Sequence, residues 1–194
     1  MAGAVNIGAG VLTPGTHTFG PDDGTLSVRT GRTGAAAKAG HDLLIAVTSW
    51  EATLELGADP ARSSLVLRAD TASLRVLEGS GGMQSLGDDD KANIVTTIDD
   101  EILKGTAIEF RSTEVRMAED GDAIEVQGEL TLTGNTRAIA FELRLGPDGR
   151  LGGRAVINQT DWGIKPYSTL FGALKVADEV AVEVSLAVAA PAAG

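Results

Sequence analysis

The chain has 194 residues, of which 43% are hydrophobic and 22% charged, values typical of one globular domain rather than of a disordered or fibrous chain. Its formal net charge is −11, so a nucleic acid or an anionic bilayer surface would repel the molecule as a whole. There is no cysteine, and the two histidines, His17 and His41, lack the spacing of a metal site. We therefore expect no disulfide, no thiolate chemistry and no cofactor.

Targeting signals are lacking in the sequence. Residues 1–12 contain no lysine or arginine, and no apolar run approaches the length of a transmembrane helix. The sequence predicts a cytoplasmic protein with no integral membrane segment, unless a signal peptide has been removed. We expect a single domain over residues 11–190.

Alternation of apolar and polar residues dominates the chain. Residues Trp50, Ala52, Leu54 and Leu56 share one face of a predicted half-buried strand. Similar runs occupy residues 65–69, 74–76, 108–110, 124–132, 139–145 and 180–188, and weaker N-terminal runs bring the total to about eight or nine strands. In the run that begins at 108 the apolar phase slips from even to odd positions, which predicts a bulge near Thr113.

Turn-forming residues separate these runs. Asp120-Gly121, Gly134-Asn135 and the segment 147–149 each join two runs across only a few residues, so sequential strands should pair antiparallel. A long meander with one apolar face must cover that face, which favours a closed barrel or a two-sheet sandwich.

One segment departs from the alternation. Residues 88–104 place Ile94, Ile98 and Ile102 four apart, with acidic residues at the start and Lys104 before Gly105, as expected for one short amphipathic helix. The glycine-rich residues 78–82 before it predict a flexible hinge. The helix is therefore a candidate lid or plug.

The apolar strand faces and one irregular segment predict the site. A barrel of about eight strands is either filled by its own side chains or holds one apolar ligand, and residues 158–179 resemble an apolar mouth. For Trp162 we favour packing at the barrel end slightly over ligand stacking. The candidate ligand-binding residues are His41, Trp50, Leu54, Ile98, Phe110, Phe141, Trp162, Tyr167, Phe171, Val182 and Val184.

Polar groups near this segment predict contacts with a headgroup. His41 opens a strand from a loop, and a structural or headgroup role is favoured over catalysis, because adjacent His41 and Asp42 would point to opposite faces. The candidates for binding a polar, especially anionic, headgroup are Lys165, Tyr167, Ser168 and Lys175.

Several segments resemble the YceI-like family of lipocalin-like proteins. Residues 128–137, GELTLTGNTR, are similar to the family's G-x-L-T-(I/L)-x-G-x-T-(K/R) segment. Residues 161–164, DWGI, with 176–180, VADEV, resemble its D-(F/W)-G-(I/V) and v-x-D-x-V segments, and residues 108–112, IEFRS, resemble I-x-F-x-S. The resemblance spans about 15–186 and implies an extended eight-stranded antiparallel barrel with one short helix at an end, enclosing the apolar tail of a polyisoprenoid or similar lipid.

The chain departs from the family pattern at two places. Residues 158–160, NQT, stand where many members have an arginine, and the family's secretory signal peptide is missing. Residues 40–44, GHDLL, resemble a cytoplasmic subgroup.

Three functions remain open from the sequence. The first is a carrier that sequesters a long apolar ligand or lipid, working as a monomer or homodimer. The second is a small-barrel cyclase or isomerase in which His41, Asp42, Asp161 or Tyr167 supplies a proton to an isoprenoid or polyene. The third is a ligand-free structural or stress protein.

Overall fold

The computed structural model describes residues 5–7, 10–12, 14–118 and 123–187. Its strands are β1 Val5–Ile7, β2 Gly10–Leu12, β3 Gly15–Phe19, β4 Gly24–Thr33, β5 His41–Val47, β6 Trp50–Leu56, β7 Ser64–Ala69, β8 Leu74–Gly81, β9 Ile108–Met117, β10 Ala123–Leu132, β11 Asn135–Leu145, β12 Arg150–Asn158, β13 Ser168–Thr169 and β14 Leu174–Ala187. The helix α1, Asp88–Thr97, continues into the π-helical turn η4, Ile98–Leu103. Short 3-10 turns are η1 Ala37–Ala39, η2 Pro60–Arg62, η3 Thr71–Ser73, η5 Gln159–Trp162 and η6 Leu170–Gly172.

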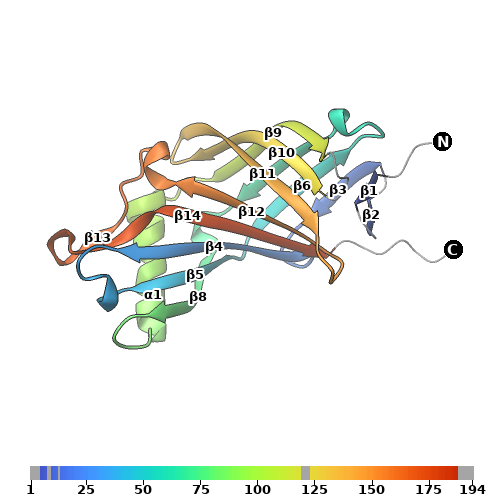
Figure 1. The fold of residues 1–194 in the computed structure, drawn as a ribbon. Coiled ribbons are helices and arrows are strands. Elements are labelled where there is room, and N and C mark those ends of the chain that lie inside the picture. The colour runs from blue at the N-terminus through green and yellow to red at the C-terminus, as the bar shows by residue number, and fades with distance from the viewer. Residues whose placement is uncertain (1–4, 8–9, 13, 119–122, 188–194) are drawn as a thin grey trace.

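One antiparallel sheet curls around the interior, in the order β3-β6-β7-β9-β10-β11-β12-β14-β4-β5-β8, and β13 pairs with β14 (Figure 1). Three pairs of these segments are single long strands bent at a corner. Gly15 pairs with Leu56, and further along the same two strands Leu26 pairs with Val47, so β3 and β4 run beside β6 and β5. The segments β7 and β8 continue each other in the same way.

Counted as continuous strands, the sheet has β3/β4, β5/β6, β7/β8, β9, β10, β11, β12 and β14, and β14 returns to pair with β4, whereas the separate segments outnumber the eight strands predicted. The fold is the predicted all-β, lipocalin-like curled sheet with one short helix. The larger number of separate segments arises because Gly20–Asp23, Thr48–Ser49 and η3 interrupt three strands at their corners.

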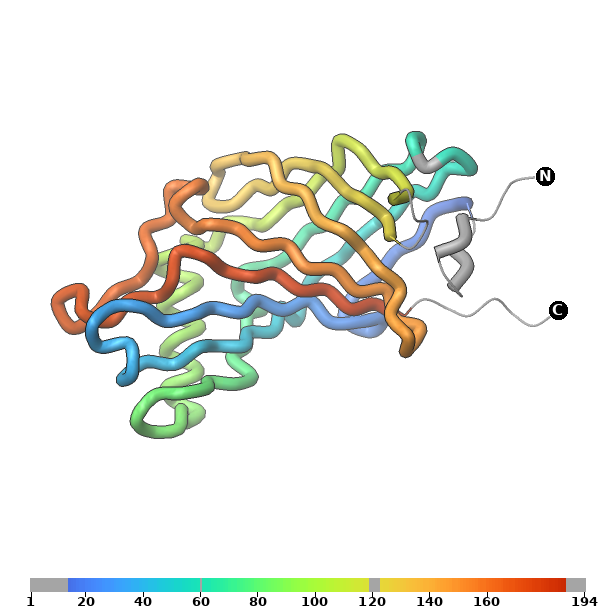
Figure 2. The backbone as a smooth tube through the Cα atoms, viewed as in Figure 1, coloured from blue at the N-terminus to red at the C-terminus, as the bar shows by residue number. Residues whose placement is uncertain are grey.

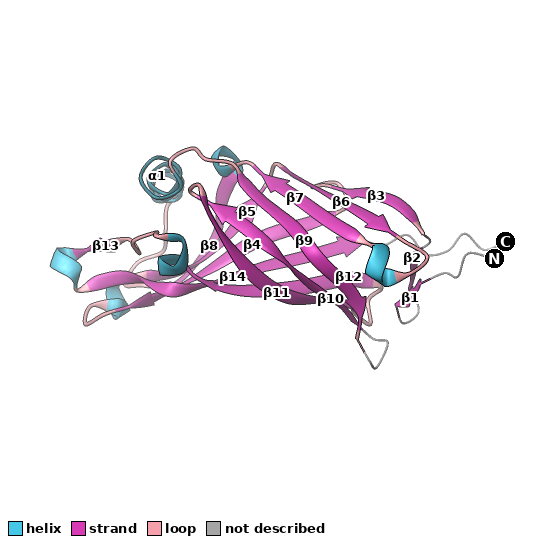
Figure 3. Cartoon of the chain, turned by 90° about the horizontal axis from the view of Figure 1, so that it is seen from above, coloured by secondary structure: helices cyan, strands magenta, loops and turns pink. Residues whose placement is uncertain are grey.

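The curled sheet is complete at one end and open at the other. Beyond Ala69, which pairs with Ile108, β8 separates from β9, and α1 packs beside β8 there. Figure 1 shows α1 crossing this end, and Figure 3 shows it end-on beside the sheet, while β1 and β2 lie at the opposite end. The helix thus occupies the gap in the wall.

Burial follows the alternation that the sequence shows. In β6, Trp50, Ala52, Leu54 and Leu56 are buried while Glu51 is exposed. The apolar faces of all the long strands turn inward and form one cluster, so the hydrophobic effect holds the curl of the sheet.

Local expectations have mixed outcomes. The bulge is confirmed at Thr113, because Gln127 pairs with Glu114 and the next residue, Gly128, pairs with Ser112. The turn expected at Gly134-Asn135 is one residue earlier, at Thr133-Gly134, both with positive φ, and Asn135 already begins β11. The segment 147–149 separates β11 from β12 as predicted, whereas Asp120-Gly121 lies outside the described residues.

The glycine-rich segment before the helix is not a free hinge. Residues 78–81 are the end of β8 and pair with β5, as in His41 with Gly81. A Cβ at Gly81 would overlap the Arg32 guanidinium, and one at Gly82 would overlap the His41 ring, and both glycines have positive φ. These glycines therefore allow close packing and left-handed backbone rather than movement.

Candidate functional site

The curled sheet encloses a cavity of about 660 Å³. Its walls are mainly aliphatic and come from every long strand and from α1; along β14 they include Val176, Val180, Val182, Val184 and Leu186. The β4 residues that pair with this stretch run from Gly24 to Arg32, and eight residue steps at about 3.3 Å each give a length of about 26 Å. The space is therefore elongated and apolar, and its size is typical of small-molecule sites.

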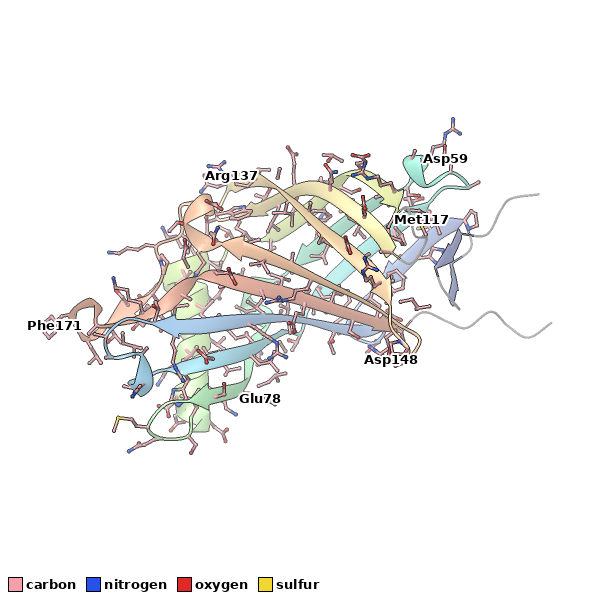
Figure 4. All side chains as sticks on the ribbon, in the orientation of Figure 1. Asp59, Glu78, Met117, Arg137, Asp148 and Phe171 are labelled. Carbon is pink, nitrogen blue, oxygen red and sulfur yellow. The ribbon has the colours of Figure 1, made fainter. Side chains whose placement is uncertain are left out.

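Nine of the eleven predicted ligand-binding residues line this cavity: His41, Trp50, Leu54, Ile98, Phe110, Phe141, Tyr167, Val182 and Val184. The other two, Trp162 and Phe171, do not line it. Phe171 is fully exposed in η6, at the extreme end of the molecule, as Figure 4 shows.

Trp162 is a packing residue of the wall. Its indole is 2% exposed, and its Nε1 donates to the carbonyl oxygen of Leu130 at 2.9 Å. Its own carbonyl accepts a hydrogen bond from Asn135 Nδ2 at 2.9 Å. These bonds fix η5 on the β10–β11 turn, so the packing role that the sequence favours slightly is the one for which the structure provides contacts.

Residues 158–160, which depart from the family pattern, meet the segment 176–180 at this wall. Asp178 accepts hydrogen bonds from the backbone N–H and the hydroxyl of Thr160, at 2.9 and 2.6 Å. Gln159 Nε2 donates to the carbonyl of Ala177 at 2.8 Å, and the Gln159 side chain also lines the cavity. These contacts hold a bulge in β14, where its register against β4 shifts between Val176 and Val180.

The polar lining gathers at the open end. Arg32, at the end of β4, donates from Nη1 to the carbonyls of Gly40 and Ser80, at 2.7 and 2.9 Å. Asp42 accepts from the backbone N–H of Arg32 at 2.9 Å. Arg32 thus ties the ends of β4, β5 and β8 together and forms one side of the mouth, and a positive charge borders the apolar space there.

The imidazole of His41 is part of this framework. Its Nε2 lies 2.7 Å from the carbonyl oxygen of Gln84, in the segment that leads into α1. Of the four residues proposed for acid–base chemistry, His41 and Tyr167 line the cavity, whereas Asp42 and Asp161 are not among its lining residues. The His41 contact with a carbonyl oxygen joins β5 to the start of the helix.

The helix and the start of β14 complete the mouth. The cavity is also lined by three residues of α1, Asp90, Asn93 and Thr97, and by Thr169 of β13 and Lys175 of β14. The helical polar residues are missing from the predicted site, because the acidic start of the helix is interpreted only as a match to the helix dipole. A helical face that repeats every three to four residues, Asp90, Asn93 and Thr97 beside Ile94 and Ile98, is the signal that could have shown them.

The strand β4 is a second omission. Leu26, Val28, Thr30 and Arg32 face the cavity at alternate positions. The alternation is visible in the sequence, but its last two positions are polar, so the pattern does not predict an apolar strand face.

The described residues contain neither a metal-binding cluster nor a membrane-spanning helix. Within these ranges no three His, Asp or Glu side chains gather as a metal site. None of the helices described is long and apolar enough to span a bilayer.

Comparisons with known proteins agree with this architecture. The crystal structure of Burkholderia cenocepacia BcnA superposes with a TM-score of 0.59 at 17% identity, covering 84% of this chain and 94% of that one. A single-cysteine mutant of the Campylobacter jejuni YCEI protein gives a TM-score of 0.50 at 14% identity, covering 73% and 81%. At such identities the likeness concerns the fold. The search of curated proteins returned no match.

Residues 32–188 match the YceI-like domain, a segment that runs from the end of β4 through all later strands and includes most of the cavity walls, but not Phe19 of β3 or Leu26, Val28 and Thr30 of β4. The chain therefore belongs to the YceI-like family.

Proposed function

We propose that this protein binds and carries a long-chain apolar ligand, a polyisoprenoid or another amphiphilic lipid, with the chain inside the curled sheet and the polar end at the mouth. The observation that carries the proposal is the elongated cavity of about 660 Å³ with apolar walls and an opening beside α1. The proposed carrier domain is residues 11–190, within which the family match lies.

The binding energy would come from burial. Moving a hydrocarbon chain out of water gains about 0.8 kcal/mol per CH₂ group, so a long tail needs few directional contacts. Selection would then depend on the length and width of the cavity. The walls are rich in Val, Leu and Ile, whose side chains contact an aliphatic chain along its whole length.

The mouth supports an amphiphile over a pure hydrocarbon. Lys175 and Tyr167 lie on neighbouring segments at the opening, where Ser168 pairs with Lys175. Asn93 lies on the opposite, helical side. An ammonium, a phenol and an amide together favour a ligand whose exposed end accepts hydrogen bonds, such as an alcohol, carboxylate or phosphate.

Native mass spectrometry of the freshly purified protein, followed by organic extraction, tests the proposal. We expect an adduct that organic solvent releases as a lipid, or an adduct formed on incubation with isoprenoid or acyl lipids. A chain mass that stays clean after incubation with lipids of several lengths would contradict the carrier function and favour a ligand-free structural protein.

The isomerase or cyclase alternative requires a proton donor at the cavity. His41 and Tyr167 are the candidates that line it. Incubation with a polyene or isoprenoid and analysis of the recovered lipid distinguishes the two functions, because a carrier returns the ligand unchanged.

A further inference from the structure

Two segments at the end of the molecule beside the cavity mouth differ in charge from the rest of the chain. Residues 33–40, which join β4 to β5, and residues 163–177, which lead into β14, contain Lys38, Lys165 and Lys175 and not one acidic residue. The whole chain has 27 acidic and 16 basic residues. All three lysines are exposed, and none takes part in the ion pairs found among the described residues.

These two segments lie against each other. The backbone N–H of Ala36 donates to the carbonyl of Ala173 at 2.9 Å, and a Cβ at Gly34 would overlap that same carbonyl. Figure 2 shows the two loops side by side at one end of the molecule. We call these residues, 33–40 and 163–177, the basic tip.

The basic tip also carries exposed apolar side chains. Phe171 is fully exposed, Leu170 is 54% exposed and Tyr167 is 43% exposed. Leu170, Phe171 and Gly172 have φ of 51°, 54° and 86°, three consecutive residues in the left-handed region, which bulky residues rarely adopt. Strained backbone that holds a large apolar side chain in solvent is typical of a binding element.

From these observations we infer that the basic tip docks on the surface of a bilayer that contains anionic phospholipids. Phe171 and Leu170 would enter the interface, while the lysines contact the lipid phosphates. The same segment borders the cavity, because Tyr167, Thr169 and Lys175 line it. Docking would therefore bring the mouth to the membrane, where a lipid could enter without crossing water.

The net charge of the whole molecule favours one orientation on the bilayer. The net charge of −11 opposes contact of the molecule as a whole with an anionic bilayer, and the basic tip contains no acidic residue, so the protein would approach with this tip first. The role of docking in lipid loading rests on the proposed carrier function. The docking itself can be tested independently of that function, because vesicle binding is measured without a ligand in the cavity.

Flotation of the protein with vesicles of phosphatidylcholine, with and without phosphatidylglycerol, tests the inference. We expect binding only to the phosphatidylglycerol vesicles, weakening as salt is added. Phe171→Asn keeps a residue that tolerates positive φ and should weaken binding roughly tenfold or more by removing the apolar side chain. Lys38→Gln and Lys165→Gln should each weaken it roughly fivefold.

Val156→Thr is the matched control, because Val156 is an apolar side chain 48% exposed on β12, away from the basic tip. It should leave vesicle binding unchanged, and unchanged thermal unfolding of every variant would show that the fold is intact. Equal binding to both vesicle types, no binding at low salt, or equal binding by Phe171→Asn and the wild type would overturn the inference. A dimer in solution that Phe171→Asn dissociates would also overturn it and assign the tip to contact between copies.

Discussion

Trp50 and Trp162, the two tryptophans of the chain, are almost equally buried, at 6% and 2% exposure, yet their indole N–H groups differ. Trp162 Nε1 donates to the carbonyl of Leu130, whereas Trp50 Nε1 has no hydrogen-bond partner among the described residues. Trp50 lines the cavity, and Trp162 packs in the wall.

This difference predicts unequal costs of replacement. Trp162→Phe leaves the carbonyl of Leu130 without its donor and should lower the free energy of unfolding by about 1–3 kcal/mol more than Trp50→Phe, which removes an N–H that has no partner. Urea denaturation of both variants measures the difference. Equal losses would show that packing volume alone decides the effect.

The same pair reports on ligand binding. In Trp162→Phe the remaining Trp50 lines the cavity, so adding a long-chain lipid should change its fluorescence intensity and emission maximum. In Trp50→Phe the remaining Trp162 should respond little. A response only from Trp162 would place the ligand outside the cavity.

Filling the cavity should oppose binding without harming the fold. Val182→Phe adds a ring inside the space between the strands, so the affinity for a long chain should fall while the free energy of unfolding stays the same or rises. Val156→Phe adds the same ring on the outer surface and serves as the control. Isothermal titration with lipids of increasing length measures the effect, and unaltered affinity in Val182→Phe would contradict the cavity as the site.

Arg32 should stabilise the backbone segments that form the cavity mouth. Arg32→Met keeps the long apolar stem but removes the hydrogen bonds to the carbonyls of Gly40 and Ser80. We expect a loss of roughly 1.5–3 kcal/mol of local stability, seen as faster amide hydrogen exchange at the end of β8 and in η1. Exchange that accelerates equally in β10, on the far wall, would indicate global destabilisation instead.

The sequence allows the walls to be predicted far better than the mouth. Alternation identifies β6 and β10, and the phase slip locates the bulge at Thr113, because both follow from the two-residue period of a strand. Six of the nine cavity residues, Trp50, Leu54, Phe110, Phe141, Val182 and Val184, share this origin, since a residue on the apolar face of a curled sheet must point inward.

The remaining features depend on contacts between distant segments. The outward position of Phe171 depends on three left-handed residues, and the packing of Arg32 on Gly81 depends on the pairing of β5 with β8. The helix ends at Lys104, with φ 57°, and Gly105 as expected, but its last turn is π-helical, which the four-residue spacing of Ile94, Ile98 and Ile102 does not indicate.

The packing of α1 on β8 has a consequence for how the protein opens. The strand β8 is the last in the sheet, and Lys91 Nζ donates to the carbonyl of Leu77 on it at 3.3 Å. An uncovered strand edge is a template for pairing with another chain. If the helix moved away to admit a ligand, the edge of β8 would become exposed and could pair with a strand of another molecule, which leads to aggregation. Entry past residues 33–40 and 163–177, at the same end as α1, avoids that risk, so the helix can stay in place and cover the edge of β8.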